Sequence, residues 1–422
     1  GIVYYKQVEE ERKLSLIYIP KVVDGTNDFW TSLIQGAEMA AKEYNIKKVF
    51  VPFQNAYEGS VVDGVDVLPA KNVMDVLAHI KGEKVIESVK YDFDAEEETK
   101  YNVDFSDVKG QDQAKRALEI AAAGGHNCLL IGPPGSGKSM LAKRLPTILP
   151  DMTFEERLET SKVYSIAGKI PSGKSLVTKR PFRSPHHTVS AQALTGGGAN
   201  PKPGEISLAH NGVMFMDEFP EFDRRAKESL RQPLEDGVVT ISRAAGTFTY
   251  PSNIMLVAAM NPCPCGYFGH PTRQCTCSPA AKKRYQDKVS GPLLDRIDIH
   301  VEVAPVEYNE LSDNNEGEKS SDIKKRVDKA RAIQQKRFAG TGITCNAKMT
   351  PKMTKECCVL SKEADELLHE SFDNFSMSAR AYDKVLRLAR TIADLADSEE
   401  IKLEHIAEAL QFRALDRKYW EV

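Results

Sequence analysis

Several features are missing from this 422-residue sequence, and their absence excludes whole classes of protein. There is no run of about 18 apolar residues, so no segment is predicted to span a membrane. No charged, apolar and small-residue signal sequence opens the chain, which starts at Gly1 rather than Met. We therefore expect a cytoplasmic protein.

An excess of positive charge is also missing. The 57 Lys and Arg residues are outnumbered by 60 Asp and Glu, giving a formal net charge of −3. Any bound DNA must therefore be held by local arginines and lysines rather than by a globally basic surface. The hydrophobic content of 41% is typical of a soluble globular protein, and the length predicts two or three domains.

One glycine-rich segment carries the strongest functional signal. The apolar run Cys128–Ile131 leads into G-P-P-G-S-G-K-S at residues 132–139, and a helical stretch begins at Met140. This is the G-x-x-x-x-G-K-[ST] phosphate-binding pattern in the strand–loop–helix setting that its chemistry requires. An ordinary glycine-rich turn is the alternative. The predicted nucleoside-triphosphate site comprises Gly132, Pro133, Pro134, Gly135, Ser136, Gly137, Lys138, Ser139 and Met140.

Hydrolysis requires a metal site and a base beyond the phosphate-binding loop. Lys138 is expected to reach the β- and γ-phosphates, while Ser139 places its hydroxyl on Mg²⁺. A second apolar run, Val213–Met216, ends in the carboxylates Asp217 and Glu218. Because ligands bind at the carboxyl ends of parallel strands, Asp217 is expected to complete the Mg²⁺ site and Glu218 to activate water.

Two more residues fit a hydrolytic site. Asn261 ends a third apolar run, Ile254–Met260, and could position the lytic water, although Asn before Pro262 is also an ordinary turn former. Arg296 suits an arginine finger, which stabilises charge on the transferring γ-phosphoryl group. A solvated or salt-bridged arginine beside Asp295 and Asp298 is the alternative, and spacing leaves both open.

Four of the eight cysteines form two C-x-C pairs separated by a short loop. Two close thiolate pairs suit a tetrahedral structural zinc site, in which His270 could replace one ligand. Reduced free thiols are an alternative, and disulfides are disfavoured in a cytosolic protein. The predicted ligands are Cys263, Cys265, Cys275 and Cys277.

Together these segments resemble the AAA+ ATPases, specifically the magnesium-chelatase-like group that contains the ComM/YifB proteins. The match runs from about Val49 to Trp420 and includes R-S-P-H-H-T at residues 183–188, N-P-C-P-C-G at 261–266 and G-P-L-L-D-R-I-D at 291–298. The resemblance implies an α/β P-loop core with a parallel sheet, followed by a helical lid. It also implies a homo-oligomeric ring, expected to be a hexamer, with ATP at the subunit junctions.

The resemblance assigns a role to each candidate residue. Arg296 would act on the nucleotide of the neighbouring subunit, and Arg380 looks like a second sensor that contacts nucleotide. The residues that would act within one subunit are Lys138, Ser139, Asp217, Glu218 and Asn261.

A DNA motor that promotes branch migration during natural transformation is the leading functional expectation, and it comes from the family. Residues 235–246 look like the hairpin that replicative helicases project into the ring pore, with Arg243 near its tip. The basic loop at 176–207 carries Arg180 and Arg183 and corresponds to an insertion that can face the pore. Solvated surface arginines are the alternative for all three, and a chelatase-like subunit that remodels a protein partner is the alternative function.

Four segments are expected along the chain. Residues 1–38 resemble the opening βα unit of a sugar-binding protein, interpreted as a truncation or fusion with no sugar ligand. Residues 39–95 resemble the tail of a Lon-protease-like domain. Residues 100–306 are expected to form the ATPase core, and residues 307–422 a linker and helical lid that includes helices at 377–396 and 403–415.

Overall fold

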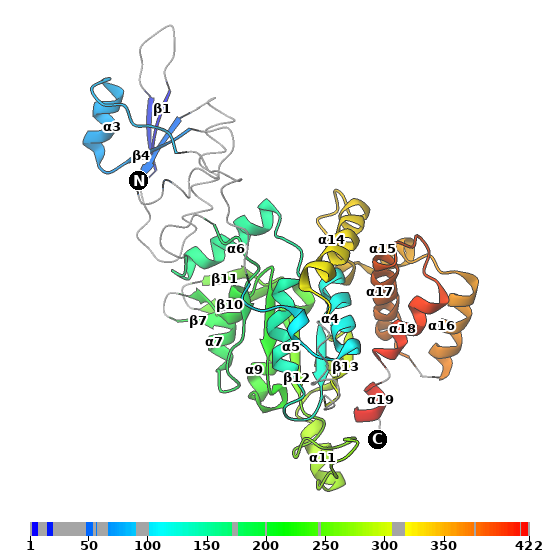
Figure 1. The fold of residues 1–422 in the computed structure, drawn as a ribbon. Coiled ribbons are helices and arrows are strands. Elements are labelled where there is room, and N and C mark those ends of the chain that lie inside the picture. The colour runs from blue at the N-terminus through cyan, green and yellow to red at the C-terminus, as the bar shows by residue number, and fades with distance from the viewer. Residues whose placement is uncertain are drawn as a thin grey trace. The chain divides into compact units, whose positions relative to one another are not determined.

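A computed structural model describes residues 2–6, 15–19, 48–53, 56, 66–89, 101–170, 176–198, 201–243, 246–305, 317–374, 377–413 and 415–420. The chain divides into two compact units (Figure 1). The first comprises Gly1–Thr99, Thr153–Thr178 and Gly198–Lys202, and the second comprises Lys100–Met152, Lys179–Gly197 and Pro203–Val422. In the described ranges, no helix has the length and apolarity needed to cross a bilayer.

A five-stranded parallel sheet forms the centre of the second unit. Its strands are β5 (Cys128–Ile131), β6 (Phe182–Arg183), β9 (Val213–Met216), β12 (Met255–Met260) and β13 (Ile299–Glu302), in the order β13-β5-β12-β9-β6. All neighbouring pairs are parallel. Full burial of β5, β9 and β12 explains why the sequence shows continuous apolar runs there. Residues that follow these three strands therefore meet at one edge of the sheet.

Helices flank the sheet and connect its strands. They include α4 (Asp112–Gly124), which ends at Gly125 in a left-handed conformation, and α5 (Lys138–Arg144) after the glycine-rich loop. The shorter helices are α7 (Ala191–Thr195), α8 (Glu205–Leu208), α9 (Arg224–Glu228), α10 (Arg231–Asp236), α11 (Pro279–Gln286) and α12 (Gly291–Leu294). The basic stretch at 176–207 thus contains β6, α7 and part of α8 rather than only irregular loop.

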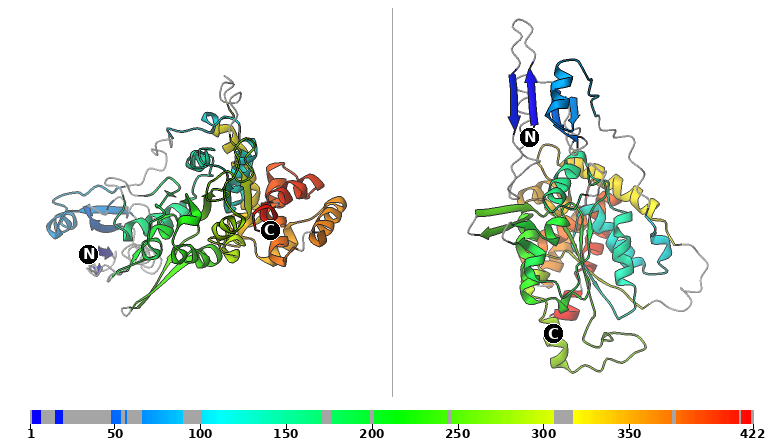
Figure 2. Two further views of the ribbon diagram at one scale, coloured as in Figure 1. Left: turned by 90° about the horizontal axis from the view of Figure 1, so that it is seen from below. Right: turned by 90° about the vertical axis from the view of Figure 1, so that its left-hand side faces the viewer.

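The hairpin expected near residues 235–246 is present. Strands β10 (Val238–Arg243) and β11 (Gly246–Pro251) pair antiparallel and extend away from the parallel sheet (Figure 2). Arg243 is the last residue of β10 and pairs with Gly246 across the ladder. The backbone therefore places Arg243 at the end of the hairpin's ladder, where the prediction put it.

The C-terminal part is helical, as the sequence predicts. Its helices are α14 (Ser320–Arg337), α15 (Pro351–Cys357), α16 (Lys362–Asn374), α17 (Ala379–Leu395), α18 (Leu403–Gln411) and α19 (Leu415–Trp420). Both α14 and α17 pack against α4, so the lid and the ATPase core share one apolar core (Figure 1).

The expected helix at 403–415 is too long. Helix α18 ends at Gln411, and the next helix begins at Leu415. The N–H of His300 on β13 donates to the carbonyl of Phe412 at 2.9 Å, and Arg413 donates to the carbonyl of Ile297 at 2.9 Å. Packing against the edge of the sheet thus interrupts a helical pattern that periodicity alone would continue.

The first unit contains a four-stranded sheet in the order β2-β1-β3-β4. Its strands are β1 (Ile2–Lys6), β2 (Ser15–Ile19), β3 (Lys48–Pro52) and β4 (Asp66–Ala70), with helices α3 (Val73–Ile80) and α6 (Phe154–Ile166). A capping box of Thr153 and Glu156 opens α6. The helical half of the expected sugar-binding-like unit, residues 27–37, lies outside the described residues. The likeness of 39–95 to a Lon-like domain stays a prediction.

A candidate nucleotide-hydrolysis site and an adjacent cysteine cluster

The segment at 132–139 forms a tight loop between β5 and α5. Gly135 and Gly137 have φ angles of +80° and +91°, in the left-handed region that favours glycine. A Cβ atom on Gly132 would lie 2.3 Å from the carbonyl oxygen of Val303, just beyond β13. Glycine is therefore needed both for the turns of this loop and for its close approach to the segment that follows β13 in the same chain.

Lys138 is held by oxygen atoms inside this loop. Its Nζ donates to the carbonyls of Gly132 and Pro133 at 2.7 and 2.8 Å, and to Asn261 Oδ1 at 3.2 Å. Burial lowers the pKa of Lys138 to about 8, although the Asp217 carboxylate opposes the shift. The loop thus presents a partly desolvated cation, ready to exchange these neutral acceptors for phosphate oxygens.

The two predicted magnesium ligands also meet. The Ser139 hydroxyl donates to Asp217 Oδ2 at 2.5 Å, across the gap between α5 and the end of β9. A hydroxyl and a carboxylate are hard oxygen ligands of the kind that Mg²⁺ takes beside substrate phosphates. The donor set therefore fits a magnesium ion bound together with a nucleotide.

Glu218 adopts an unusual backbone conformation. Its φ is +52°, which is uncommon for a residue other than glycine. The carboxylate Oε2 lies 3.0 Å from His187 Nδ1, a contact that the sequence pattern of residues 183–188 does not indicate. The expected base is thus paired with a histidine from the segment after β6.

One cavity of about 450 Å³ brings together four of the five predicted catalytic residues. Lys138, Asp217, Glu218 and Asn261 line it together, because three parallel strands deliver them to the same edge of the sheet. The remaining wall includes residues that sequence reasoning missed, among them Arg284 and Tyr285 on α11 and Lys288 just after it. The N-terminal capping signal of α11, Ser278 before Pro279, marks the helix but not what it faces.

Arg296 and Arg380 lie elsewhere. They line a second cavity of about 480 Å³, which none of the residues 132–139 reaches. The Arg296 guanidinium contacts Glu235 and also donates to the carbonyl of Pro292 at 2.6 Å. Arg296 is thus salt-bridged, as the alternative predicted, but its partner is Glu235 rather than Asp295.

Two of the arginines considered for DNA are engaged within the chain. Arg180 donates to the carbonyls of Pro150, Asn211 and Asp151 at 2.5, 2.8 and 3.2 Å. Arg183 donates from Nε to Glu205 Oε2 at 2.6 Å. These contacts give both guanidinium groups a structural role in fixing the start of the basic stretch.

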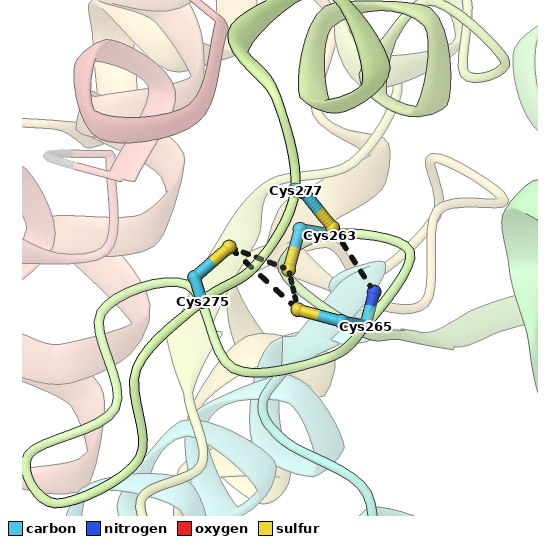
Figure 3. Close-up of side chains that lie close together, drawn as sticks. All are labelled: Cys263, Cys265, Cys275 and Cys277. Carbon is cyan, nitrogen blue, oxygen red and sulfur yellow. Dashed lines mark hydrogen bonds between the residues drawn. The ribbon is translucent and has the colours of Figure 1, made fainter.

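The four clustered cysteines lie together (Figure 3). Their sulfur atoms are all within 4.8 Å of one another, and all four are free thiols. Cys263 Sγ is 3.4 Å from Cys265 Sγ and 3.7 Å from Cys275 Sγ. Cys277 Sγ accepts a hydrogen bond from the Cys265 N–H at 3.4 Å. Disulfides are therefore absent from the described cluster, and the four sulfurs are close enough to share one metal ion.

Within the cluster only Cys265 has a lowered pKa, since burial raises the pKa of the Cys263 and Cys277 thiols. Burial would raise the pKa of the Cys265 thiol, but the backbone N–H groups of Tyr267 and Thr276 outweigh it and lower the pKa to about 6. His270 Nδ1 instead accepts from the N–H groups of Thr272 and Arg273 at 3.2 and 3.1 Å. Among the described residues, the group that could hold a metal ion comprises the four cysteines and not His270, which was considered as a replacement for one of them.

Comparison with known proteins identifies the family. The family model described as magnesium chelatase, subunit ChlI, matches residues 104–311, and the model of the ChlI C-terminal part matches residues 317–413. YifB of Escherichia coli is 43% identical over 373 residues, covering 88% of this chain and 72% of that protein. The competence protein ComM of Haemophilus influenzae is 41% identical over 386 residues, covering 89% and 74%.

The chain belongs to the ComM/YifB family of magnesium-chelatase-like AAA+ ATPases. Membership of the ComM/YifB family supports ATPase activity with ATP and Mg²⁺. It also confirms the predicted AAA+ fold, with its parallel sheet and helical lid. AAA+ proteins commonly form oligomers. A more distant match is the maternal DNA replication licensing factor mcm6 of Xenopus tropicalis, 21% identical over 345 residues and covering 74% of this chain and 36% of that protein.

Proposed function

We propose that this chain is a subunit of an ATP-driven ring motor that acts on single-stranded or branched DNA, in branch migration during natural transformation. The observation that carries the proposal is the β10–β11 hairpin, which extends from the ATPase unit and has Arg243 beside its turn. The names of two relatives, a competence protein and a DNA replication licensing factor, point to the same class of substrate.

The proposal of a ring is supported by the separation of the candidate residues into two cavities. Lys138 and Glu218 line the first, whereas Arg296 and Arg380 line the second. An arginine finger must touch the γ-phosphoryl group, so the arginines of one chain serve the nucleotide of a neighbour. We extend the trans role to Arg380, because it shares its cavity with Arg296. A hexamer follows the family expectation.

A second function has its own support. The matching family model is that of a magnesium chelatase subunit, so the same ATPase could remodel a protein partner without DNA. The two functions differ in what stimulates hydrolysis. We expect single-stranded or branched DNA to raise the ATPase rate of the purified chain; a rate indifferent to DNA but raised by a partner protein would favour the second function.

DNA binding should depend on the hairpin rather than on overall charge. We expect Arg243→Ala to weaken binding to all DNA sequences and to reduce the salt dependence, because it removes phosphate contacts and no base contact. The measurement is DNA affinity against salt concentration for Glu218→Gln protein with ATP, which should keep rings assembled. Arg231→Ala, on α10 in the same unit, is the matched control. An unchanged salt slope in Arg243→Ala contradicts the proposed contact.

We also propose that the cysteine cluster binds one structural zinc ion. Four free thiols within 4.8 Å of one another provide the spacing of a Cys₄ site. Protein prepared without chelator should contain about one zinc per chain. Replacing Cys275 and Cys277 by Ser should remove it, whereas Cys345→Ser should not. A metal-free wild-type protein would refute the site.

A further inference from the structure

We propose that residues 263–288, here named the cysteine arm, carry Arg284 into the hydrolysis cavity as a ligand of the γ-phosphate of ATP bound to the same chain. This inference rests on the proposed ATPase site and on the proposed zinc ion. It assigns to the arm a direct part in distinguishing ATP from ADP.

The cysteines of the arm lie between the end of β12 and the start of α11. Cys263 lies two positions after Asn261, and Cys277 immediately precedes Ser278, the N-cap of α11. Ser278 Oγ accepts a hydrogen bond from the Ala281 N–H at 3.2 Å. A metal ion bound by all four sulfurs would therefore fasten the first turn of α11 to the end of the strand that carries Asn261.

The inner face of α11 is anchored to the core. Tyr285 is buried, and it hydrogen-bonds to the backbone of Asn261. Burial, together with the carboxylate of Glu221, raises the pKa of the Tyr285 phenol, so it stays neutral. Just beyond the helix, Lys288 Nζ lies 2.9 Å from both carboxylate oxygens of Glu221. These contacts hold the helix against the cavity.

Arg284 is placed differently from its neighbours. It lines the cavity with Lys138, Asp217 and Glu218, yet its side chain is exposed, and the described part of the chain provides no hydrogen-bond or ion-pair partner for it. An unpaired guanidinium offers a planar set of donors that matches phosphate oxygens. Arg296, by contrast, is paired with Glu235 in the other cavity.

The charges of the cavity agree with this role. Asp217 is expected to bind Mg²⁺, and Lys138 lies in the loop that is expected to bind the β-phosphate. A terminal phosphate would then lie between Glu218 and α11, where Arg284 supplies the positive charge. ADP lacks that phosphate, so a contact from Arg284 should favour ATP selectively.

The test compares affinity for ATP and ADP in Glu218→Gln protein, which should bind ATP without turnover. We expect Arg284→Ala to weaken ATP binding roughly tenfold, the loss of one charge-assisted contact, and to leave ADP binding unchanged. Arg284→Lys should restore part of the difference. Lys283→Ala, an exposed neighbour on α11 outside the cavity, is the matched control. Equal ATP-to-ADP preference in Arg284→Ala and Lys283→Ala overturns the proposal.

The zinc link is tested by combining variants. Replacing Cys275 and Cys277 by Ser should lower the ATP affinity of protein that retains Arg284. The same replacement should cause little further loss of ATP affinity in Arg284→Ala protein, because both changes remove the same contact. Thermal unfolding of each variant checks that the chain remains folded. Equal losses of ATP and ADP affinity on removal of the cysteines overturn the link. Protein that binds neither nucleotide would instead refute the ATPase site itself.

Discussion

Lys138 will exchange its present partners for phosphate oxygens when ATP binds, and this exchange has a pH signature. Without nucleotide its pKa is lowered to about 8, and the phosphate charges will raise it. Below pH 8 the amine is already protonated, so the affinity for ATP does not change with pH. Above pH 8 binding must take up a proton, so affinity falls with rising pH by up to about tenfold per unit.

Calorimetric titration with ATP between pH 7 and 9.5 measures this effect. Lys138→Arg is the control, because a guanidinium stays charged over this range and should flatten the profile. A wild-type affinity that does not change above pH 8 contradicts the assignment.

Individual residues differ in how well the sequence reveals their place. Lys138, Asp217 and Asn261 follow buried parallel strands, so their convergence could be predicted from apolar runs alone. Arg284 and His187 could not be found this way, because only tertiary packing brings α11 to the cavity and His187 to Glu218. Arg180 shows a different limit of the sequence. The basic composition of its segment suggests a phosphate contact, but the guanidinium donates to three backbone carbonyls of the same chain.

At the scale of elements, α17 is joined to the core by a nearly buried ion pair. Lys384 Nζ lies 3.3 Å from Asp298 Oδ1 and donates to the carbonyl of Ile297 at 3.1 Å. Burial would raise the pKa of Asp298, but Lys384 and then His126 outweigh it and hold the pKa well below its usual range. The carboxylate therefore stabilises the fold above about pH 4, and this contribution is lost on acidification.

Removing the cation should leave this carboxylate unpaired. We expect Lys384→Met to lower the free energy of unfolding by about 3 kcal/mol, whereas Lys384→Met with Asp298→Asn should lose less, because no buried charge remains. Urea unfolding at pH 7 measures both, and Lys362→Met, at an exposed position of α16, is the control. A single variant as stable as wild type would show that the pair contributes nothing.

Element boundaries could be predicted where the cause is local. Gly125 ends α4, and Thr153 with Glu156 opens α6, because capping depends on residues a few positions apart. The end of α18 could not be predicted in this way, because it depends on a hydrogen bond from His300, which lies over a hundred positions away along the chain.

For the whole molecule, the two cavities predict complementation between inactive chains. Arg296→Ala should bind nucleotide nearly as wild type but hydrolyse it about 10³-fold more slowly. Lys138→Ala should not bind nucleotide at all. Mixing the two should restore activity, because Lys138→Ala chains still offer Arg296 to a neighbour. ATPase rates across a range of mixing ratios measure the effect. No recovery at any ratio argues that Arg296 acts within its own chain or only structurally.

The order of the parallel sheet also has a consequence for how the protein is made. Strand β5, which leads into the phosphate-binding loop, pairs on one side with β12 and on the other with β13. Both partners come more than a hundred residues later, as the pairing of Cys128 with Val257 and Ile299 shows. Contacts so distant in sequence form slowly. The ribosome must therefore synthesise the chain to residue 302 before both strands that flank β5 can pair with it and support the loop.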